Sequence, residues 1–174
     1  MRRLRRKVVF RGRVFRVEQD QVQLPNGRTV AMDVVRHRGS VVIVPQPSRR
    51  EVILIRQFRY AIGRWIWELP AGSLERGESP RTAVRRECEE EINLTPRRVS
   101  KLGAWYPTPG FCDERMMFYR CEDLVAPTRA VHVDPDEQIE PRVYTLAAAR
   151  KLVDRGDILD MKTVLGLGLI DTSA

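Results

Sequence analysis

GSLERGESPRTAVRRECEEEINL, residues 72–94, is the stretch that decides the fold of this chain. It holds six glutamates and four arginines, and its second half has apolar residues at helical spacing. On a helical wheel Val84, Cys88 and Ile92 form one apolar stripe, and three carboxylates border it: Glu87, Glu90 and Glu91. A solvated charged helix with ion pairs one turn apart is one interpretation of this pattern, and a metal site is the other.

The ends of this helix can also be predicted. Ser79 is a typical N-cap residue, and Pro80 suits the first helical position because it lacks an N–H group. Asn93 can end the helix in the left-handed conformation, which asparagine tolerates better than most residues. We therefore predict a helix from residue 80 to about residue 92.

The glutamates at the border of the stripe need positive partners. Like charges one turn apart repel each other, and partial burial of an unpaired carboxylate costs much more. Arg86 can pair with Glu90 on the next turn, but one arginine cannot balance three carboxylates. Oxygen-rich clusters suit Mg²⁺ or Mn²⁺. The loop before the helix contains a proline and two glycines, so it can turn sharply and direct the carbonyl of Ala71 at the same ions.

The spacing of residues in this stretch closely resembles the Nudix box of the Nudix hydrolases. The matching positions are Gly72, Glu78, Arg86, Glu87, Cys88, Glu90, Glu91 and Leu94. Asn93 stands where the family has glycine, and we expect this change to be tolerated because asparagine is the next-best residue at a helix C-cap. The resemblance implies an α/β/α sandwich and hydrolysis of a nucleoside diphosphate linked to another moiety, with Mg²⁺ or Mn²⁺ as cofactor.

The same resemblance implies a role for each matching residue. The implied metal ligands are the carboxylates of Glu87 and Glu91, the assisting carboxylate of Glu90, and the carbonyl of Ala71. The implied catalytic residues are Glu90, Arg86, which would orient the carboxylates, and Glu78, which would support the loop. The physical logic is that bridging metal ions neutralise the charge of a pyrophosphate and lower the pKa of the attacking water.

The resemblance also implies a general base in a late acidic loop, here residues 132–143, HVDPDEQIEPRV. Pro135 occupies a place where the resemblance leads us to expect an acid. Glu137 is the best remaining candidate, as base or as a further metal ligand, with Asp136 and Asp134 behind it. A solvated acidic loop is the alternative for any one of these residues.

Residues outside the box are similar to the ADP-ribose pyrophosphatase subfamily. The similar segments are RQFRYAIGR (56–64), WELPAG (67–72), YPTPGFCDE (106–114) and RGDILDMKTVLGLGLI (155–170). The resemblance implies hydrolysis of ADP-ribose to AMP and ribose 5-phosphate. The implied contacts are Arg28 and Arg59 with phosphate or adenosine, and Thr108, Gly110 and Glu114 with the terminal ribose. A solvated side chain is the alternative for Arg28 and Glu114, and a turn for Gly110.

The net charge of +8 is concentrated at the N-terminus. Residues 1–16 contain eight basic residues and no acid, whereas the remaining 23 basic and 23 acidic residues balance each other. Such an arm can bind nucleic acid or another polyanion, or it can be a frayed, solvated tail. In the subfamily that the chain resembles, the N-terminal strands of one subunit cross to its partner, so the resemblance implies a homodimer through this arm.

The length of 174 residues fits one α+β domain with an arm. We expect an N-terminal β arm at residues 1–37 and a Nudix-type core with a mixed central sheet at residues 38–174. The expected strands are 8–24, 28–37, 40–45, 51–58, 116–121 and 142–146. A two-residue Asn26-Gly27 turn should join the first two strands. Two further helices are expected at 145–153 and 160–170.

The sequence also argues against several classes of protein. No apolar run is long enough to cross a membrane, and the basic N-terminus lacks the apolar segment of a secretory signal. The three cysteines form no CxxC pair, so we expect a reduced, cytoplasmic protein.

Two alternatives to ADP-ribose hydrolysis stay open. One is hydrolysis of another nucleotide sugar such as GDP-mannose or ADP-glucose, and the other, less favoured, is nucleic-acid binding through the basic arm on a Nudix fold.

Overall fold

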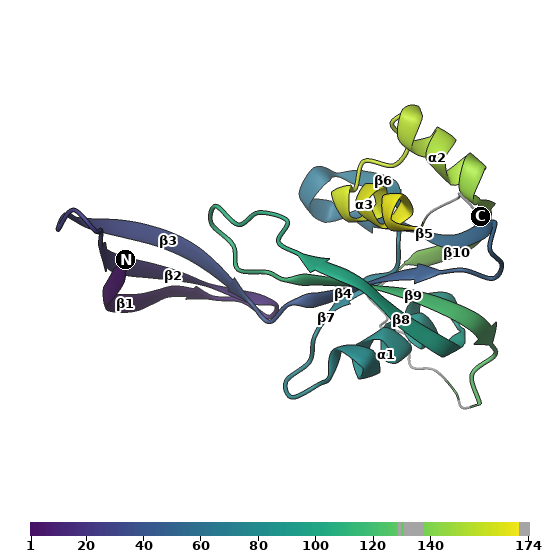
Figure 1. Cartoon of the computed structure of the whole chain (residues 1–174), viewed down its shortest axis with the longest axis horizontal. Helices are drawn as coiled ribbons and strands as arrows, with labels where there is room; N and C mark the ends of the chain where they lie inside the picture. The colour runs from purple at the N-terminus through teal and green to yellow at the C-terminus, as the bar shows by residue number, and fades with distance from the viewer. Residues whose placement is uncertain (129, 131–137, 171–174) are drawn as a thin grey trace.

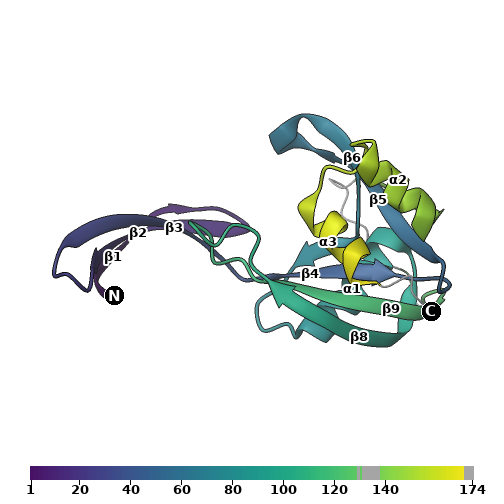
Figure 2. The same ribbon diagram turned by 45° about the horizontal axis from the view of Figure 1, so that its top comes forward.

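The computed structural model describes residues 1–128, 130 and 138–170. In these ranges the chain forms an α+β fold with a curved sheet at the N-terminus and a layered core (Figure 1). The N-terminal sheet, here called the arm sheet, consists of the antiparallel strands β1 (Arg2–Arg11), β2 (Phe15–Gln23) and β3 (Thr29–His37), in the order β1-β2-β3. It projects from one end of the core in both views (Figure 1, Figure 2).

The strands of the core are divided between two sheets. One has the order β10-β5-β6 and contains β5 (Glu51–Arg59), β6 (Arg64–Glu68) and β10 (Ile139–Thr145). The other has the order β7-β4-β9-β8 and contains β4 (Ser40–Pro45), β7 (Ala71–Ser73), β8 (Thr95–Trp105) and β9 (Met116–Val125). In the second sheet β4 and β9 are parallel and the other neighbours are antiparallel. A mixed sheet was predicted, but the core has two sheets rather than one.

Helices cover both sides of the core. Helix α1 (Pro80–Ile92) lies on one side, and α2 (Leu146–Asp154) and α3 (Met161–Leu169) lie on the other, with a 3-10 turn, η1 (Tyr60–Ile62), between β5 and β6 (Figure 1). This arrangement confirms the expected α/β/α sandwich. Both C-terminal helices begin where they were expected, and their N-caps are Thr145 and Asp160. Each helix in the described ranges is too short or too polar to cross a membrane.

Alternation along β4 explains why its central residues, 41–44, are all apolar. Every residue of this strand is buried. Val41 and Ile43 pack in a cluster with α1, whereas Val42 and Val44 pack in a cluster with α2 and α3. Because successive side chains of a strand point to opposite faces, a strand covered on both sides needs apolar residues at every position. The continuous run in residues 40–45 thus places this strand between the two helical layers.

The N-terminal residues form a strand, which differs from both the expected single strand at 8–24 and the expected solvated tail. Gly12 N–H donates to the carbonyl of Phe15 at 2.8 Å and closes a turn that separates β1 from β2. The basic residues before this turn pair with β2 in antiparallel register, for example Arg6 with Asp20. The acids of β2 balance part of the positive charge, so a strand with many arginines can be ordered here.

The β2–β3 hairpin forms where it was expected, but around a different turn. The carbonyl of Leu24 accepts a hydrogen bond from Gly27 N–H at 3.0 Å, and Leu24 N–H donates to the carbonyl of Arg28 at 2.8 Å. The central residues of the turn are therefore Pro25 and Asn26, followed by Gly27 with a φ of 83°. Proline suits the first central position of a four-residue turn, and the left-handed glycine that follows completes a three-residue loop.

Sequence patterns did not reveal β6, β7 or β8. Strand β8 has exposed polar residues at several positions and a proline at its second position. It lies at the edge of its sheet, where proline and charged residues are tolerated because one side needs no hydrogen-bonded partner. Its partner β9 follows after the loop 106–115, and the periodicity within one strand does not show such pairing.

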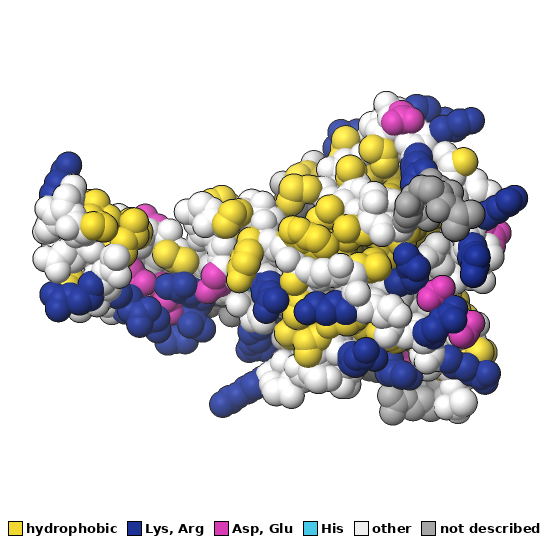
Figure 3. All heavy atoms as spheres, viewed as in Figure 1, with side chains coloured by type: hydrophobic (Ala, Val, Ile, Leu, Met, Phe, Trp, Pro, Cys, Tyr) yellow, Lys and Arg dark blue, Asp and Glu magenta, His cyan; other side chains and the backbone are white. Residues whose placement is uncertain are grey.

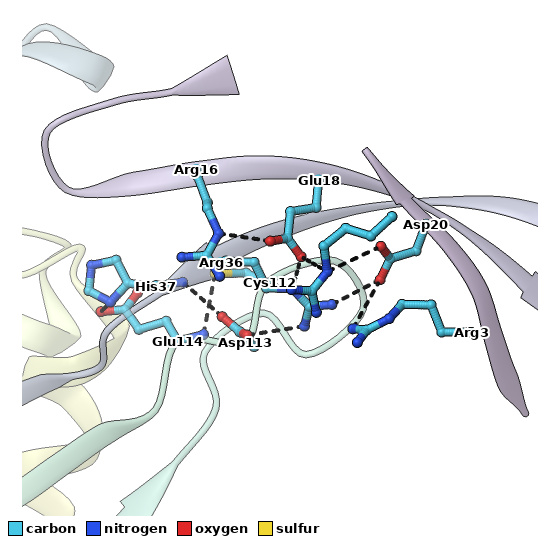
Figure 4. A network of polar contacts seen from close by, with 10 residues as sticks. Arg3, Arg16, Glu18, Asp20, Arg36, His37, Cys112, Asp113 and Glu114 are labelled. Atoms are coloured by element: carbon cyan, nitrogen blue, oxygen red, sulfur yellow. Dashed lines mark hydrogen bonds and ion pairs between the residues drawn. The ribbon is translucent and has the colours of Figure 1, made fainter. Parts of the chain in front are cut away.

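A buried acidic pair holds the arm sheet to the loop before β9 (Figure 4). Glu18 is 1% exposed and accepts hydrogen bonds from Nε of Arg16 and Nε of Arg36, each at 2.8 Å. Arg36 also contacts Asp20 and Asp113, each at 3.1 Å. Asp113 belongs to the loop between β8 and β9, so Arg36 joins the arm to a segment 77 residues further along the chain.

The backbone of β3 binds the same loop. Val35 N–H donates to the carbonyl of Phe111 at 2.7 Å, and Asp113 N–H donates to the carbonyl of Val35 at 3.1 Å. His37 N–H donates to the carboxylate of Asp113 at 2.8 Å. The loop therefore lies along β3, and the arm sheet and the loop support each other.

The arginines around Glu18 also control its protonation. Burial alone would raise the pKa of the Glu18 carboxyl, but the hydrogen bonds from Arg16 and Arg36 and the charge of Arg6 outweigh burial. Together they lower the pKa from 4.5 to about 2. Glu18 thus stays ionised at a pH at which most carboxylates are protonated.

Glu18→Gln should make the free energy of unfolding depend less on pH in the acid range. The folded-state pKa of Glu18 is lowered, so its carboxylate stabilises the fold above pH 4.5, and this contribution is lost as the pH falls from 4.5 toward 2. The wild-type free energy of unfolding should decrease across this interval, and that of the variant should decrease less. Urea unfolding followed by circular dichroism measures both. Glu140→Gln, at an exposed acid 3.9 Å from Arg56, is the control. An equal decrease in Glu18→Gln and wild type would contradict the prediction.

Candidate active site

The predicted helix of residues 80–92 is confirmed with both of its caps. Ser79 Oγ accepts a hydrogen bond from Thr82 N–H at 3.2 Å, and Pro80 is the first helical residue. Asn93 has a φ of 53°, in the left-handed region, and its N–H donates to the carbonyls of Cys88 and Glu89. Asparagine thus ends the helix as expected.

Arg86 gathers the carboxylates of the box. It binds Glu78 through two hydrogen bonds, Nε to Oε1 at 2.9 Å and Nη2 to Oε2 at 3.0 Å. Its Nη1 lies 2.7 Å from Glu87 Oε1 and 2.8 Å from Glu90 Oε2. Its Nη2 also donates to the carbonyl of Ser73 at 3.3 Å. One planar guanidinium therefore joins the helix to the loop before it.

These contacts shift the pKa values of Arg86 and Glu78 in opposite directions, and each shift favours the charged form of the side chain. The hydrogen bonds to Glu78 and the charges of Glu87 and Glu90 raise the pKa of Arg86, although burial opposes the shift. The hydrogen bonds from Arg86 lower the pKa of Glu78 against the effect of burial, and the backbone N–H of Glu75 contributes. The predicted orienting role of Arg86 and supporting role of Glu78 fit this geometry.

The two principal glutamates of the box are buried beside the loop. Glu87 is 7% exposed and Glu91 is 6% exposed. Ala71 N–H donates to Glu91 Oε2 at 2.9 Å. A Cβ atom on Gly72 would overlap the carboxylate of Glu87. Glycine at this position thus lets the carboxylate lie against the backbone of the loop.

The donor set of this region fits a hard divalent cation, because the buried acids of α1 offer carboxylate oxygens only. Within the described residues, no three His, Cys, Asp or Glu side chains are close enough together to hold a metal ion. Arg86 supplies positive charge to Glu87 and Glu90 instead. The contact of Ala71 runs through its N–H. The metal-ligand roles of Glu87, Glu90, Glu91 and the Ala71 carbonyl stay predictions.

A pocket of about 400 Å³ adjoins the box. Its lining includes Ala71 and Gly72 from the loop, Arg59 from the end of β5 and Glu114 from the loop before β9. Three separate parts of the sequence therefore contribute predicted site residues to one concave surface. Such a surface, with converging polar groups, is typical of a small-molecule site.

Arg59 keeps its positive charge at this pocket. It forms two hydrogen bonds with Glu68, Nε to Oε1 at 2.7 Å and Nη2 to Oε2 at 2.8 Å. Burial would lower the pKa of Arg59, but Glu68 outweighs burial and raises it, and the charges of Glu91 and Asp160 act in the same direction. The negative charge of Glu91, a residue of the box, thus helps to raise the pKa of Arg59.

Glu114 lies at the rim of the pocket. Its Oε1 accepts a hydrogen bond from Ser40 Oγ at 2.8 Å and lies 3.7 Å from Nδ1 of His37. That Nδ1 accepts a hydrogen bond from Gly39 N–H at 3.1 Å. The pairing with Ser40 shows that Glu114 has a fixed place beside the pocket, although its contact with a ribose stays a prediction.

Three other predicted substrate residues lie outside the pocket lining. Thr108 and Gly110 belong to the loop that binds β3, where the carbonyl of Thr108 accepts from the N–H groups of Phe111 and Cys112. Gly110 has open space around its Cα, so sterics do not demand glycine there. Arg28 follows the β2–β3 turn, whose place is the far end of the arm sheet (Figure 1). Within one chain, Arg28 is therefore not brought to the pocket.

The candidate bases Glu137, Asp136 and Asp134 lie outside the described residues.

Several polar residues of this region were not identified from the sequence. They are Glu68 and Lys162, which are buried against each other, and Asp160, which contacts Lys162. All three stand in segments that resemble the subfamily, Glu68 in residues 67–72 and the other two in residues 155–170, but no role was assigned to any of them. Lys162 interrupts an otherwise apolar helix, and that interruption is the one sequence signal that indicated a special role.

Comparisons with known proteins show which proteins this chain resembles. A family model described as the NUDIX domain matches residues 36–162, and one described as the nucleoside diphosphate sugar hydrolase N-terminal domain matches residues 1–31. An ADP-ribose pyrophosphatase of Bacillus subtilis (strain 168) is 35% identical over 159 residues, which cover 91% of this chain and 86% of the relative. A methanol dehydrogenase activator of Bacillus methanolicus is 34% identical with the same coverage. A solved structure described as an ADP compounds hydrolase aligns with a TM-score of 0.81 and 25% identity, over 97% of this chain and 91% of that chain.

Gly72→Ala should disturb the carboxylate cluster more than the fold. The added Cβ would overlap the carboxylate of Glu87, which must then move away from the loop. Glu87 has a flexible side chain, so we expect a change in the midpoint of thermal unfolding of only a few degrees, and loss of the rise in that midpoint produced by Mn²⁺ in the wild type. Gly168→Ala, on the exposed side of α3 where a Cβ meets no atom, is the control. An undiminished Mn²⁺ effect in Gly72→Ala would contradict the prediction.

Proposed function

The chain belongs to the Nudix family of hydrolases, and on that premise we propose that it hydrolyses the pyrophosphate bond of ADP-ribose to give AMP and ribose 5-phosphate. The observation that carries the proposal is the convergence of the box loop, Arg59 and Glu114 on one pocket. Relatives named as hydrolases of ADP-ribose or ADP compounds support it. The name of the Bacillus methanolicus relative does not state a substrate, so several nucleotide sugars belong in the test.

The residues of the box would hold Mg²⁺ or Mn²⁺. Glu87 and Glu91 are the proposed principal ligands, with assistance from Glu90 and the carbonyl of Ala71. The bound ion would neutralise the pyrophosphate and lower the pKa of the attacking water. Arg86 would orient these carboxylates through its contacts with Glu87 and Glu90.

Other residues of the pocket would bind and orient the substrate. Arg59 presents a guanidinium fixed by Glu68 and can donate further N–H groups to phosphate oxygens. Glu114, held by Ser40, would accept hydrogen bonds from hydroxyl groups of the terminal ribose. The proposed base is Glu137, with Asp136 and Asp134 as the alternatives. The remaining ribose contacts would come from Thr108 and Gly110.

We also propose that two copies of the chain form a homodimer through the arm, residues 1–37, while residues 38–174 form the catalytic core. The arm sheet exposes apolar side chains, including Leu4, Val9 and Phe10, and its outer strand β1 has a free edge within the described chain. Arg28 cannot reach the pocket of its own chain, so a role in substrate binding requires the arm of a partner. A cytoplasmic location stays a prediction.

Substrate specificity can be tested by product analysis. The protein is incubated with Mg²⁺ and ADP-ribose, GDP-mannose, ADP-glucose or NADH, and the products are separated by ion-exchange chromatography. We expect AMP and ribose 5-phosphate from ADP-ribose, and a loss of about a hundredfold or more in kcat for Glu91→Gln, because a principal metal ligand is removed.

Glu89→Gln is the matched control for this experiment. Glu89 lies on the same helix, but it accepts a hydrogen bond from Thr95 and has no place in the box pattern. Faster hydrolysis of GDP-mannose or ADP-glucose would favour the other nucleotide sugars. Absence of turnover with all four substrates would refute the proposed function.

The dimer can be tested by placing charge on the arm. Leu4→Glu combined with Phe10→Glu should shift the protein from dimer to monomer in sedimentation velocity, because both exposed apolar side chains would otherwise be buried between subunits. Tyr60→Glu, at a 91% exposed aromatic residue of η1, is the control and should remain dimeric. A wild-type protein that sediments as a monomer would contradict the proposal.

A further inference from the structure

A second charged cluster lies in the wall of the same pocket. It consists of Arg59 at the end of β5, Glu68 at the end of β6, and Asp160 and Lys162 at the start of α3. Arg59 and Glu68 meet through two parallel hydrogen bonds, which fix the plane of the guanidinium. These bonds occupy two of the five N–H groups of an arginine, so others remain able to donate to an anion in the pocket.

Lys162 is the unusual member of this cluster. It is 7% exposed, and its Nζ donates to Oε2 of Glu68 and, at 2.8 Å, to Oδ2 of Asp160. Glu68 is 1% exposed, so its carboxylate has Arg59 on one side and Lys162 on the other. Removing one partner from a buried charged pair is costly because the other charge is left without compensation. The position of Glu68, and of the guanidinium it orients, therefore depends on Lys162.

Asp160 fixes the cluster to the backbone. Its Oδ2 accepts hydrogen bonds from Thr163 N–H at 3.0 Å and from Thr163 Oγ1 at 2.6 Å. The same Oγ1 accepts a hydrogen bond from Leu69 N–H at 2.7 Å, two residues before Ala71. The first turn of α3 is thus tied to the loop that begins the box, and Lys162 is held on both sides.

The cluster carries two positive and two negative side chains, so its formal charge is zero. Loss of Lys162 would leave a net negative charge in a pocket wall that is already near the acids of α1. A negative wall repels an anionic substrate, and an Arg59 engaged by an unbalanced carboxylate is less available to it. Both effects weaken the binding of a diphosphate without touching the reacting atoms.

We propose that Lys162 and Glu68 are positioning residues that hold Arg59 where it meets the diphosphate of the substrate. The identity of that substrate, ADP-ribose, is taken from the proposed function, on which this proposal rests. Neither residue contacts the reacting bond in this scheme. Their effect should therefore appear in KM rather than in kcat.

The test is a steady-state analysis with ADP-ribose and Mg²⁺. Lys162→Met should raise KM roughly tenfold and change kcat less than about twofold, since one oriented charge contact with the substrate is lost. Lys162→Arg keeps the charge and should restore most of the affinity. Lys151→Met, at an exposed lysine of α2, is the matched control and should behave as wild type.

A double-mutant cycle shows whether Lys162 acts through Arg59. If it does, Arg59→Ala combined with Lys162→Met should be no worse than Arg59→Ala alone. Additive effects would overturn the proposal, as would a folded Lys162→Met variant with wild-type KM or with a loss confined to kcat. If thermal unfolding shows that Lys162→Met is not folded, Glu68→Gln takes its place in the cycle with the same expected rise in KM.

Binding of inorganic pyrophosphate, measured by calorimetry, separates this proposal from the proposed function. The wild type should bind pyrophosphate, and Lys162→Met should bind it roughly tenfold more weakly. If this difference in binding is observed but the wild type does not hydrolyse ADP-ribose, the proposed substrate is refuted and the positioning role of Lys162 is kept. Equal binding by both proteins, or no binding by the wild type, would overturn the positioning role.

Discussion

The geometry of the candidate active site depends on one guanidinium, that of Arg86. It contacts Glu78 twice, and Glu87 and Glu90 once each, so three carboxylates that would repel each other share one cation. Its further bond to the carbonyl of Ser73 fixes the loop relative to the helix. A lysine could supply the charge but not this set of directed donors. The absence of a side chain at Gly72 is the second condition, because it leaves room for Glu87.

A second arginine, Arg36, has a comparable role between the arm sheet and the core. Its bonds to Glu18, Asp20 and Asp113 place the arm beside the loop that carries Glu114 (Figure 4). The acids of β2 also use part of the positive charge that the sequence concentrates at the N-terminus. Figure 3 shows many basic side chains along one side of the arm, with acidic side chains among them. This internal pairing weakens the argument for nucleic-acid binding by the arm.

Features that depend on neighbouring residues could be predicted from the sequence, and features that depend on distant residues could not. The caps of α1 at Ser79 and Asn93 and the burial of its glutamates follow from local chemistry and helical spacing. The contacts of Lys162 with Glu68 and of Arg36 with Asp113 join residues 94 and 77 positions apart. The ordering of the N-terminal arginines in β1 likewise required acids from another strand.

The box and the pocket wall come from different parts of the chain. In the proposed function, the box would supply the reaction chemistry and the wall would select the substrate. The carboxylates and Arg86 come from one continuous loop and helix, so their spacing can be recognised in a sequence. The wall that would select the substrate combines the ends of β5 and β6, the start of α3 and the loop before β9. Substitutions in these segments can change the preferred nucleotide sugar while the box stays intact. The Arg59 cluster matters for this reason, because its four charged residues all lie outside the box.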